Sequence, residues 1–194
     1  MAWYDLDKNQ TQSKRDYLAQ CRYDKSVGIM ADRFTDIIEQ ELKQGVQYRI
    51  VTENSFNAVV ILDAIDKLYD IDEVIIAVYR MNINAVNRIK EWAEKIPCTV
   101  LLSSFFRENK KYEQWTREIE LFAKSNKMKL AFAWSHAKIF LAKTKCGKHI
   151  VFEGSGNLSD NARIEQYILE DNRQIYDFHK SWINEIINDE NKGR

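Results

Sequence analysis

The chain has 194 residues with 29 basic and 29 acidic side chains, and this balanced charge excludes a generic polyanion-binding protein. Its length, its single proline and its sparse glycine predict one compact domain over residues 1–194, without linkers or repeats. Residues 1–16 are too polar for a secretory leader, no apolar run is long enough to cross a membrane, and the three cysteines lack metal-ligand spacing, so we expect a cytoplasmic protein with free thiols.

Helix and strand signals alternate through the first half of the chain. Apolar residues recur with helical spacing in some segments and form short continuous runs, typical of buried strands, in others. In chain order we expect a helix at 32–44 closed by Gly45, a strand at 46–52, a helix at 57–68, a strand at 73–79, a helix at 84–95 and a strand at 98–102. The turn at 80–82, after a buried strand, is a candidate substrate edge.

The second half of the chain continues this alternation. We expect a helix at 110–125, strands at 134–142, 149–153 and 167–169, and a closing helix at 174–187. This order of elements predicts an α/β fold, in which a mixed sheet has helices on both faces.

The expected strand at 134–142 contains two polar residues, His136 and Lys138. Side chains alternate between the two faces of a strand, so both residues are expected to point the same way. A turn at 143–148 would join this strand to the next one and place the two strands side by side. Polar groups at the start of the first strand would then lie beside those that follow the second.

The second strand of this pair runs into a glycine-rich segment. Its residues are Gly154, Ser155, Gly156 and Asn157. The alternation of side chains aligns Ser155 with Asn157. The two glycines allow a ligand to approach the backbone closely, as phosphate-binding loops require.

Together these side chains suit one phosphate group. Lys138, Ser155 and Asn157 can neutralise and hydrogen-bond its non-bridging oxygens. His136 can attack phosphorus, because a neutral imidazole is present near pH 7. A lone histidine in an apolar strand is usually structural, but the combination with the glycine-rich segment favours a phosphate site.

The pattern His-x-Lys followed by Gly-Ser-x-Asn resembles the signature of the phospholipase D superfamily. The positions that match are His136, Lys138, Gly154, Ser155 and Asn157. The sequence over 134–183 is similar to the single-motif phospholipase-D-like proteins of phages and prophages. The resemblance implies the phospholipase D fold, a covalent phosphohistidine on His136, and neither a metal nor another cofactor.

One position departs from the family pattern. Lys143 stands where the superfamily has Asp, and that Asp is regarded as supporting the local fold rather than touching the phosphate. The family also uses a downstream acid, for which Glu165 is the best match. Its expected role is to accept a proton from the second ring nitrogen of His136. Glu153 and Glu170 are weaker candidates.

Other polar residues have plainer interpretations. His149 and His179 are expected at the surface, and Arg163 is either a phosphate contact or a solvent-facing side chain. A basic turn next to the phosphate site can follow a nucleic-acid backbone, although a solvated hairpin tip explains it equally well. The lysines of this turn are Lys143, Lys145 and Lys148.

The family mechanism needs two His-x-Lys motifs, and this chain has one. We therefore expect a homodimer whose two-fold axis passes through a shared site, with His136 of each copy on opposite sides of one phosphate. The leading hypothesis is a metal-independent phosphodiesterase, a nuclease acting on DNA or RNA. A phospholipid hydrolase or transferase, and a nucleic-acid-binding module with an inactive site, are the alternatives.

Overall fold

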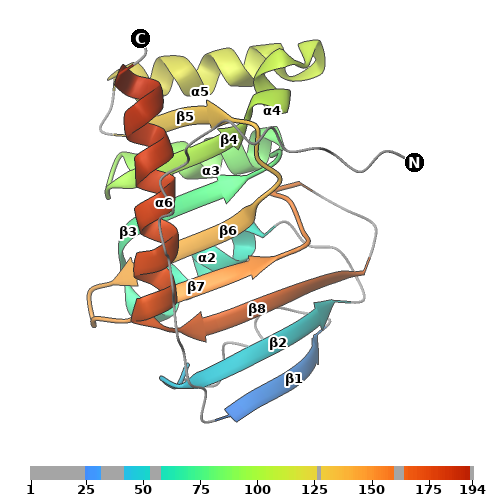
Figure 1. The fold of residues 1–194 in the computed structure, drawn as a ribbon, viewed down its shortest axis with the longest axis vertical. Coiled ribbons are helices and arrows are strands. Elements are labelled where there is room, and N and C mark those ends of the chain that lie inside the picture. The colour runs from blue at the N-terminus through green and yellow to red at the C-terminus, as the bar shows by residue number, and fades with distance from the viewer. Residues whose placement is uncertain (1–24, 32–41, 53–57, 126–127, 160–163, 193–194) are drawn as a thin grey trace, which may run out of the picture.

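Eight strands form one mixed sheet in the computed structural model, which describes residues 25–31, 42–52, 58–125, 128–159 and 164–192. The strands are β1 (Lys25–Ala31), β2 (Val46–Thr52), β3 (Ile71–Val78), β4 (Cys98–Ser103), β5 (Lys129–Ala133), β6 (Lys138–Thr144), β7 (His149–Gly154) and β8 (Glu165–Asp171). They lie in the order β1-β2-β8-β7-β6-β3-β4-β5 (Figure 1). β3, β4 and β5 are parallel, whereas β6, β7 and β8 alternate in direction.

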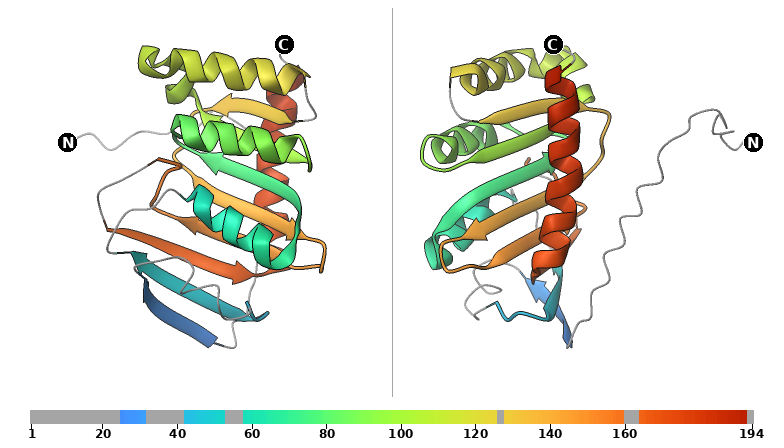
Figure 2. Two further views of the ribbon diagram at one scale, coloured as in Figure 1. Left: turned by 180° about the vertical axis from the view of Figure 1, so that it is seen from behind. Right: turned by 60° about the vertical axis from the view of Figure 1, so that its left-hand side comes forward.

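Helices cover both faces of this sheet (Figure 2). On one face lie α2 (Val59–Tyr69), α3 (Ile83–Ala93) and α5 (Glu113–Ser125), and α6 (Arg173–Lys192) crosses the other face. A short helix, α4 (Ser104–Glu108), and a 3-10 turn, η1 (Lys110–Tyr112), connect β4 to α5. The predicted α/β class and the placement of helices on both faces are confirmed.

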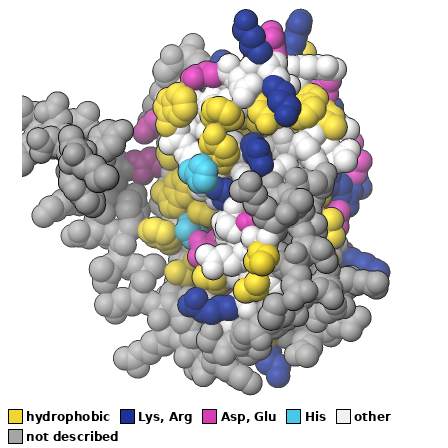
Figure 3. Space-filling view, turned by 90° about the vertical axis from the view of Figure 1, so that its right-hand side faces the viewer, with side chains coloured by type: hydrophobic (Ala, Val, Ile, Leu, Met, Phe, Trp, Pro, Cys, Tyr) yellow, Lys and Arg dark blue, Asp and Glu magenta, His cyan; other side chains and the backbone are white. Residues whose placement is uncertain are grey.

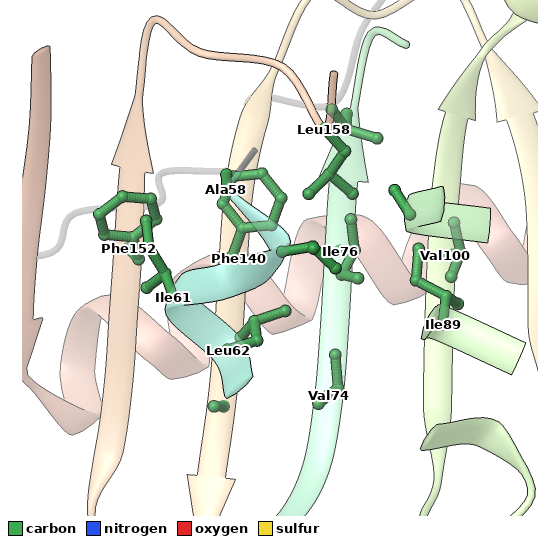
Figure 4. Close-up of a cluster of buried hydrophobic side chains, with 14 of the residues drawn as sticks. Ala58, Ile61, Leu62, Val74, Ile76, Ile89, Val100, Phe140, Phe152 and Leu158 are labelled. Atoms are coloured by element: carbon green, nitrogen blue, oxygen red, sulfur yellow. The ribbon is translucent and has the colours of Figure 1, made fainter. Parts of the chain in front are cut away.

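The larger apolar core lies between the sheet and the helices α2, α3 and α5. Figure 4 shows Ile61 and Leu62 of α2 beside Phe140 of β6, with Phe152 on the neighbouring strand β7. The rings of Phe140 and Phe152 lie 5.8 Å apart in a tilted arrangement, which is favourable for aromatic pairs. This core fixes the register of β6 and β7, whose ends carry the polar motif.

The smaller core lies under α6. Tyr176, Ile183 and Ile187 of this helix are fully buried and share one stripe of its surface. Burying each such side chain stabilises the fold by about 1.5–3 kcal/mol. The stripe fixes α6 on the sheet, and the helix thereby presents its polar residues to neighbouring strands.

Most predicted elements are confirmed within a few residues of their ends. The strands expected at 46–52, 73–79, 98–102, 149–153 and 167–169 are β2, β3, β4, β7 and β8, and the helices expected at 57–68, 84–95, 110–125 and 174–187 are α2, α3, α5 and α6. The helix expected at 32–44 lies mostly outside the described residues, and Gln44 forms a β-bridge with Asp171 instead. β1 and β5 were not predicted.

The strand predicted at 134–142 is confirmed as β6 only from Lys138 onward, and its first four residues are not in a strand. β5 ends at Ala133, β6 begins at Lys138, and residues 134–137 connect them. β4 and β3 lie between β5 and β6, so the connection spans three strand spacings, or about 14 Å. The Cα steps from Ala133 to Lys138 reach at most about 17 Å, so this segment must be nearly extended. This extended conformation explains why the sequence of the segment resembles that of a strand.

Candidate active site

The polar motif residues gather at one edge of the sheet, where β3 and β4 end and β6 begins. β6 lies between β7 and β3, so its first residue is bordered by the end of β7 on one side and the end of β3 on the other. Figure 3 views the molecule toward this edge and shows histidine, acidic and basic side chains among exposed hydrophobic ones. The segment before β6 and the segment after β7 lie at the same end of the β6–β7 hairpin. The two motif segments therefore meet at this edge.

His136 lies in the connection between β5 and β6, and not in a strand as predicted. Its side chain is exposed, and the connection passes the ends of β4 and β3. The Ser135 hydroxyl accepts a hydrogen bond from the backbone N–H of Ala137 (3.1 Å). This local bond restrains the backbone on both sides of His136.

The Lys138 ammonium group holds the His136 ring. Lys138 Nζ lies 2.6 Å from His136 Nδ1 and 3.4 Å from Nε2, and it donates to the His136 carbonyl oxygen (2.9 Å). The ammonium group therefore lies against the imidazole ring, within reach of both ring nitrogens. A cation and a candidate nucleophile thus lie side by side where β6 begins.

Lys138 is the buried cation of the site, with 8% of the residue exposed. Burial lowers the pKa of Lys138 below the ordinary 10.5; the Glu165 carboxylate raises it in part, and the Arg80 guanidinium lowers it further. A charged lysine is costly in this position because it has lost water. An anion bound here would replace the lost solvation, which makes this point the natural place for a phosphate.

Ser155 is tied to the start of β8. Its hydroxyl donates to a Glu165 carboxylate oxygen and accepts from the Gln166 N–H (3.0 Å), and its own N–H donates to the Gln166 carbonyl oxygen (3.0 Å). Among the described residues, the ring nitrogens of His136 have hydrogen-bond geometry to Lys138 alone. Glu165 therefore reaches the site through Ser155, and its role as the partner of His136 stays a prediction.

Asn157 is tied to the segment that follows β3. Its Oδ1 accepts from the backbone N–H of Arg80 (3.3 Å), and the Asn82 N–H donates to the Leu158 carbonyl oxygen (2.8 Å). An isolated bridge between Met81 and Leu158 continues this contact. The glycine-rich segment thus runs beside residues 80–82, and this turn, singled out in the sequence as a candidate substrate edge, borders the site.

The two glycines of the motif are required by packing. A Cβ on Gly154 would overlap the Gln166 carbonyl oxygen, and one on Gly156 would overlap the Tyr167 hydroxyl. From the sequence, the expected reason for these glycines was that a ligand must approach the backbone. In the structure, the close neighbour of both positions is β8.

Sequence reasoning missed two aromatic residues that contact the site. The ring of Tyr79 lies 4.6 Å from the His136 ring at 46° and is stacked 5.2 Å from the ring of Phe105. Both residues follow closely after buried parallel strands that end at this edge. An aromatic residue within two positions of each strand end was the signal available in the sequence.

The lysines of the β6–β7 turn lie at the opposite edge of the sheet (Figure 1). Lys143 is five residues from Lys138 along β6, which corresponds to about 16 Å. The expectation that these lysines lie next to the phosphate site is therefore wrong. Each also has an acidic neighbour: Lys143 with Asp72 (3.7 Å), Lys145 with Asp70 (3.9 Å) and Lys148 with Asp171 (3.3 Å).

The expectation that His179 lies at the surface is also wrong. It is 9% exposed, on α6, and its Nε2 lies 3.3 Å from Glu153 Oε2. His149 is half-buried, with its ring edge against Tyr176. Glu170 lies toward the far end of β8 and accepts from the Asn172 amide (3.1 Å).

Metal-ligand clusters are absent from the described ranges: no three His, Cys, Asp or Glu side chains there are placed to hold a metal ion. None of the described helices is long and apolar enough to span a membrane. Cys98 and Cys146 are free thiols, as expected, and burial raises the pKa of Cys98 to about 12. Cys21 and Arg163 lie outside the described residues.

The fold is similar to that of solved structures, although no family model and no curated protein matches the chain. One similar structure is a phospholipase D family member, Nuc from Salmonella typhimurium, with a TM-score of 0.55 and 10% identity over 73% of this chain and 93% of that one. Another is TrmBL2, an archaeal chromatin protein described with a novel mode of DNA binding, with a TM-score of 0.49 and 16% identity over 78% of this chain and 55% of that one. The likeness to Nuc confirms the phospholipase-D-like fold.

Proposed function

We propose that this protein is a phosphodiesterase, a nuclease that uses His136 as its nucleophile and needs no metal ion. The observation that carries the proposal is the 2.6 Å contact between the His136 ring and buried Lys138, beside Ser155 and Asn157. The phospholipase-D-like fold supports it. Lys138 and Arg80 supply the positive charge that a divalent cation supplies in many other phosphodiesterases.

In the first step, the Lys138 ammonium group turns from the His136 ring to the bound phosphate. A His136 nitrogen then forms a bond to phosphorus, while the bond from phosphorus to the leaving oxygen breaks. Lys138 and Ser155 stabilise the charge on the non-bridging oxygens, and so does the amide of Asn157 once it turns to the ligand. The product of this step is a phosphohistidine.

The leaving oxygen needs a proton, and the imidazole that attacks cannot also supply it. A second copy of the chain would supply it from its own His136, which requires a homodimer with a shared site. The exposure of the His136 side chain supports this arrangement. So do Trp134 and Ile164, which are 75% and 71% exposed beside the site, because association covers apolar surface of this kind.

In the second step, the imidazole of the second copy removes a proton from water, and the resulting hydroxide attacks phosphorus. The bond between His136 and phosphorus breaks, so the ring returns to its neutral form. Glu165 would stabilise the imidazolium formed in each half-reaction by accepting from its second ring nitrogen. That role needs the Glu165 carboxylate to move away from Ser155.

The aromatic surroundings of His136 favour a nucleic acid over a lipid as the substrate. The ring of Tyr79 lies 4.6 Å from the His136 ring and is stacked on the ring of Phe105. The bases of a nucleic acid stack on aromatic rings of this kind.

The alternative of a binding module with an inactive site rests on Lys143 in place of the motif Asp. Lys143 lies about 16 Å from Lys138 along β6, so it does not alter the groups around the phosphate. The replacement of the motif Asp by Lys143 instead affects how the far end of the hairpin is held, and there Lys143 pairs with Asp72. We therefore propose an active site.

Cleavage of labelled single-stranded DNA and RNA in the presence of EDTA tests the proposal. The wild-type chain should cleave one of them, and His136→Ala should lose about 10³-fold or more in rate because the nucleophile is gone. His149→Ala, which changes a histidine at the opposite edge, should keep its activity. Dependence on a divalent cation, or equal rates for the wild type and His136→Ala, would refute the mechanism, and sedimentation showing only monomer during turnover would refute the shared site.

A further inference from the structure

Two aromatic side chains continue the candidate active site beyond His136. Tyr79 directly follows β3, and Phe105 lies in α4, directly after β4; β3 and β4 are parallel and end at the same edge of the sheet (Figure 1). The centre of the Tyr79 ring lies 4.6 Å from that of the His136 ring and 5.8 Å from Lys138 Nζ. The Phe105 ring is stacked on Tyr79, with 5.2 Å between centres and 14° between planes. This aromatic pair, Tyr79 and Phe105, therefore adjoins the groups proposed to attack and hold the phosphate.

Phe105 is held in place by its own segment. The Ser103 hydroxyl accepts from the Phe105 N–H (3.3 Å) at the start of α4. The next residue, Phe106, is fully buried, and its ring is stacked 4.8 Å from that of Tyr112. Phe105 itself is half-buried, as is Tyr79. Both rings are thus fixed by their neighbours and keep exposed surface, so a ligand that stacks on them loses little ordering entropy of the protein.

The position of the aromatic pair beside a phosphate site suits a nucleotide. Proteins that bind single strands combine cations, which follow the phosphates, with aromatic rings, on which successive bases stack. Here Lys138 supplies the cation and the aromatic pair supplies the rings. In a nucleotide one sugar joins the phosphate to the base, so a base next to a phosphate at Lys138 can reach the pair, whose nearer ring centre is 5.8 Å from Nζ.

A base can stack on these rings only when it is unpaired. In a duplex the neighbouring base pairs cover both faces of each base, and the base must leave the stack before a protein ring can contact it. Duplex binding also depends on many lysine and arginine contacts to phosphates. The chain has as many acidic as basic residues, and the lysines of the β6–β7 turn pair with aspartates at the opposite edge. Both observations favour a single strand.

We propose that the aromatic pair stacks on a base next to the scissile phosphate, and that the protein therefore cleaves single strands in preference to duplexes. The inference rests on the proposed function, since it requires the phosphate at Lys138. Tyr79 also contacts the His136 ring, so its removal acts on the nucleophile as well as on the base. In the described part of the chain, the Phe105 ring reaches the site through Tyr79, so substitution of Phe105 separates the two effects.

Initial rates of the full chain in EDTA test this inference on three substrates of equal length. The first is a thymidine or uridine strand, whichever the wild type cleaves. The second is the same strand annealed to its complement, and the third carries abasic sugars in place of the nucleosides. For the wild type, kcat/KM on the single strand should exceed that on the duplex and on the abasic strand by about tenfold, as expected for one base–aromatic contact.

Phe105→Leu keeps an apolar side chain but removes the aromatic face. It should lower kcat/KM on the single strand by about fivefold or more, mainly through KM, and leave kcat/KM on the abasic strand within about twofold of the wild type. Phe105→Tyr, which keeps a ring, should stay within about twofold on both strands. The matched control is Phe122→Leu on α5, beside Lys90 in the last turn of α3, and it should change neither rate.

The comparison of substrates needs no variant, so it holds even where a substitution disturbs α4. Equal rates of the wild type on the single strand and the duplex, or on the single strand and the abasic strand, would overturn the inference and leave the phosphodiesterase standing. So would a loss in Phe105→Leu that is as large on the abasic strand as on the single strand, because Phe105 would then act on the structure alone. Absence of cleavage of all three substrates would overturn the proposed function, and the inference with it.

Discussion

The two ends of the β6–β7 hairpin both carry lysines, but in opposite surroundings. At the turn, the lysines are partly or fully exposed and each has an aspartate within 4 Å, as in the pairs Lys143–Asp72 and Lys145–Asp70. At the other end, Lys138 is buried, has a lowered pKa and contacts the His136 ring. The turn is locally neutralised, whereas the start of β6 keeps a positive charge that has lost water.

This difference shows that an anion site cannot be found by counting basic residues. Exposed ion pairs contribute about 0–1 kcal/mol and present little net charge to a polyanion. A buried cation next to Arg80 and a hydroxyl has a much stronger requirement for a bound anion. The buried end of the hairpin is therefore the functional one in the proposal.

Among the changes that compare the two ends of the hairpin, removal of the buried charge has the largest expected effect. Lys138→Met should lower the rate of phosphodiester cleavage by about 10²–10³-fold, because a preorganised donor to the phosphate is lost. The same change should stabilise the protein by about 1 kcal/mol at pH 7, which raises Tm by about 2–4 °C, because a partly dehydrated charge is removed. Kinetics and thermal melting measure the two effects.

The pH dependence of this stabilisation has a definite sign. The pKa of Lys138 is lowered in the folded state, so its charge destabilises the wild type at all pH values below that pKa. The penalty disappears as the pH rises toward the ordinary 10.5. The Tm difference between Lys138→Met and the wild type should thus be largest at neutral pH and shrink as the pH approaches 10.5. Lys129→Met, at an exposed position of β5, is the control. A Lys138→Met variant less stable than the wild type at pH 7 would contradict the account.

A smaller effect is expected from the glycine-rich segment at the buried end. Gly156→Ala places a methyl group on the Tyr167 hydroxyl and should destabilise the protein by about 1–3 kcal/mol. Tyr167→Phe should relieve part of this cost, which a double-mutant cycle with chemical denaturation would show as a favourable coupling. A Gly156→Ala variant as stable as the wild type, with no coupling to Tyr167, would mean that the glycine is not required by this contact.

The smallest effect is expected at the turn. Combined substitution of its lysines by alanine should change the cleavage rate by less than about twofold and leave the salt dependence of kcat/KM unaltered, because each charge is already neutralised. The residues to change are Lys143, Lys145 and Lys148. A decrease of the salt slope by two or three would show instead that the turn contacts the substrate backbone.

The hairpin and its two motif segments could be predicted from sequence, because apolar runs, a turn and a glycine-rich segment are all local signals. The placement of Lys143 could have been predicted too. It follows Lys138 by five residues on one strand, and that spacing alone puts it at the other end of the hairpin. The error lay in treating proximity in sequence as proximity in space.

The burial of His179 was also within reach of a helical pattern. His179 follows Tyr176 by three residues and precedes Ile183 by four, which places all three on one stripe of α6. That His136 lies in a connection, and not in a strand, could not be predicted. An extended segment has the same apolar pattern whether or not it pairs with a neighbouring strand. Which strands lie between β5 and β6 is a property of the whole sheet.

The segment from Ala133 to Lys138 must cross about 14 Å with a chain that reaches about 17 Å. A connection this close to its full length can change its shape very little. The position of the His136 ring is therefore set by the length of the connection as much as by hydrogen bonds. Shortening it by one residue would pull the edge strand out of place, and lengthening it by one would let the imidazole swing freely. A displacement of β5, for example by a bound partner, would therefore move His136 as well, because the connection is too short to absorb it.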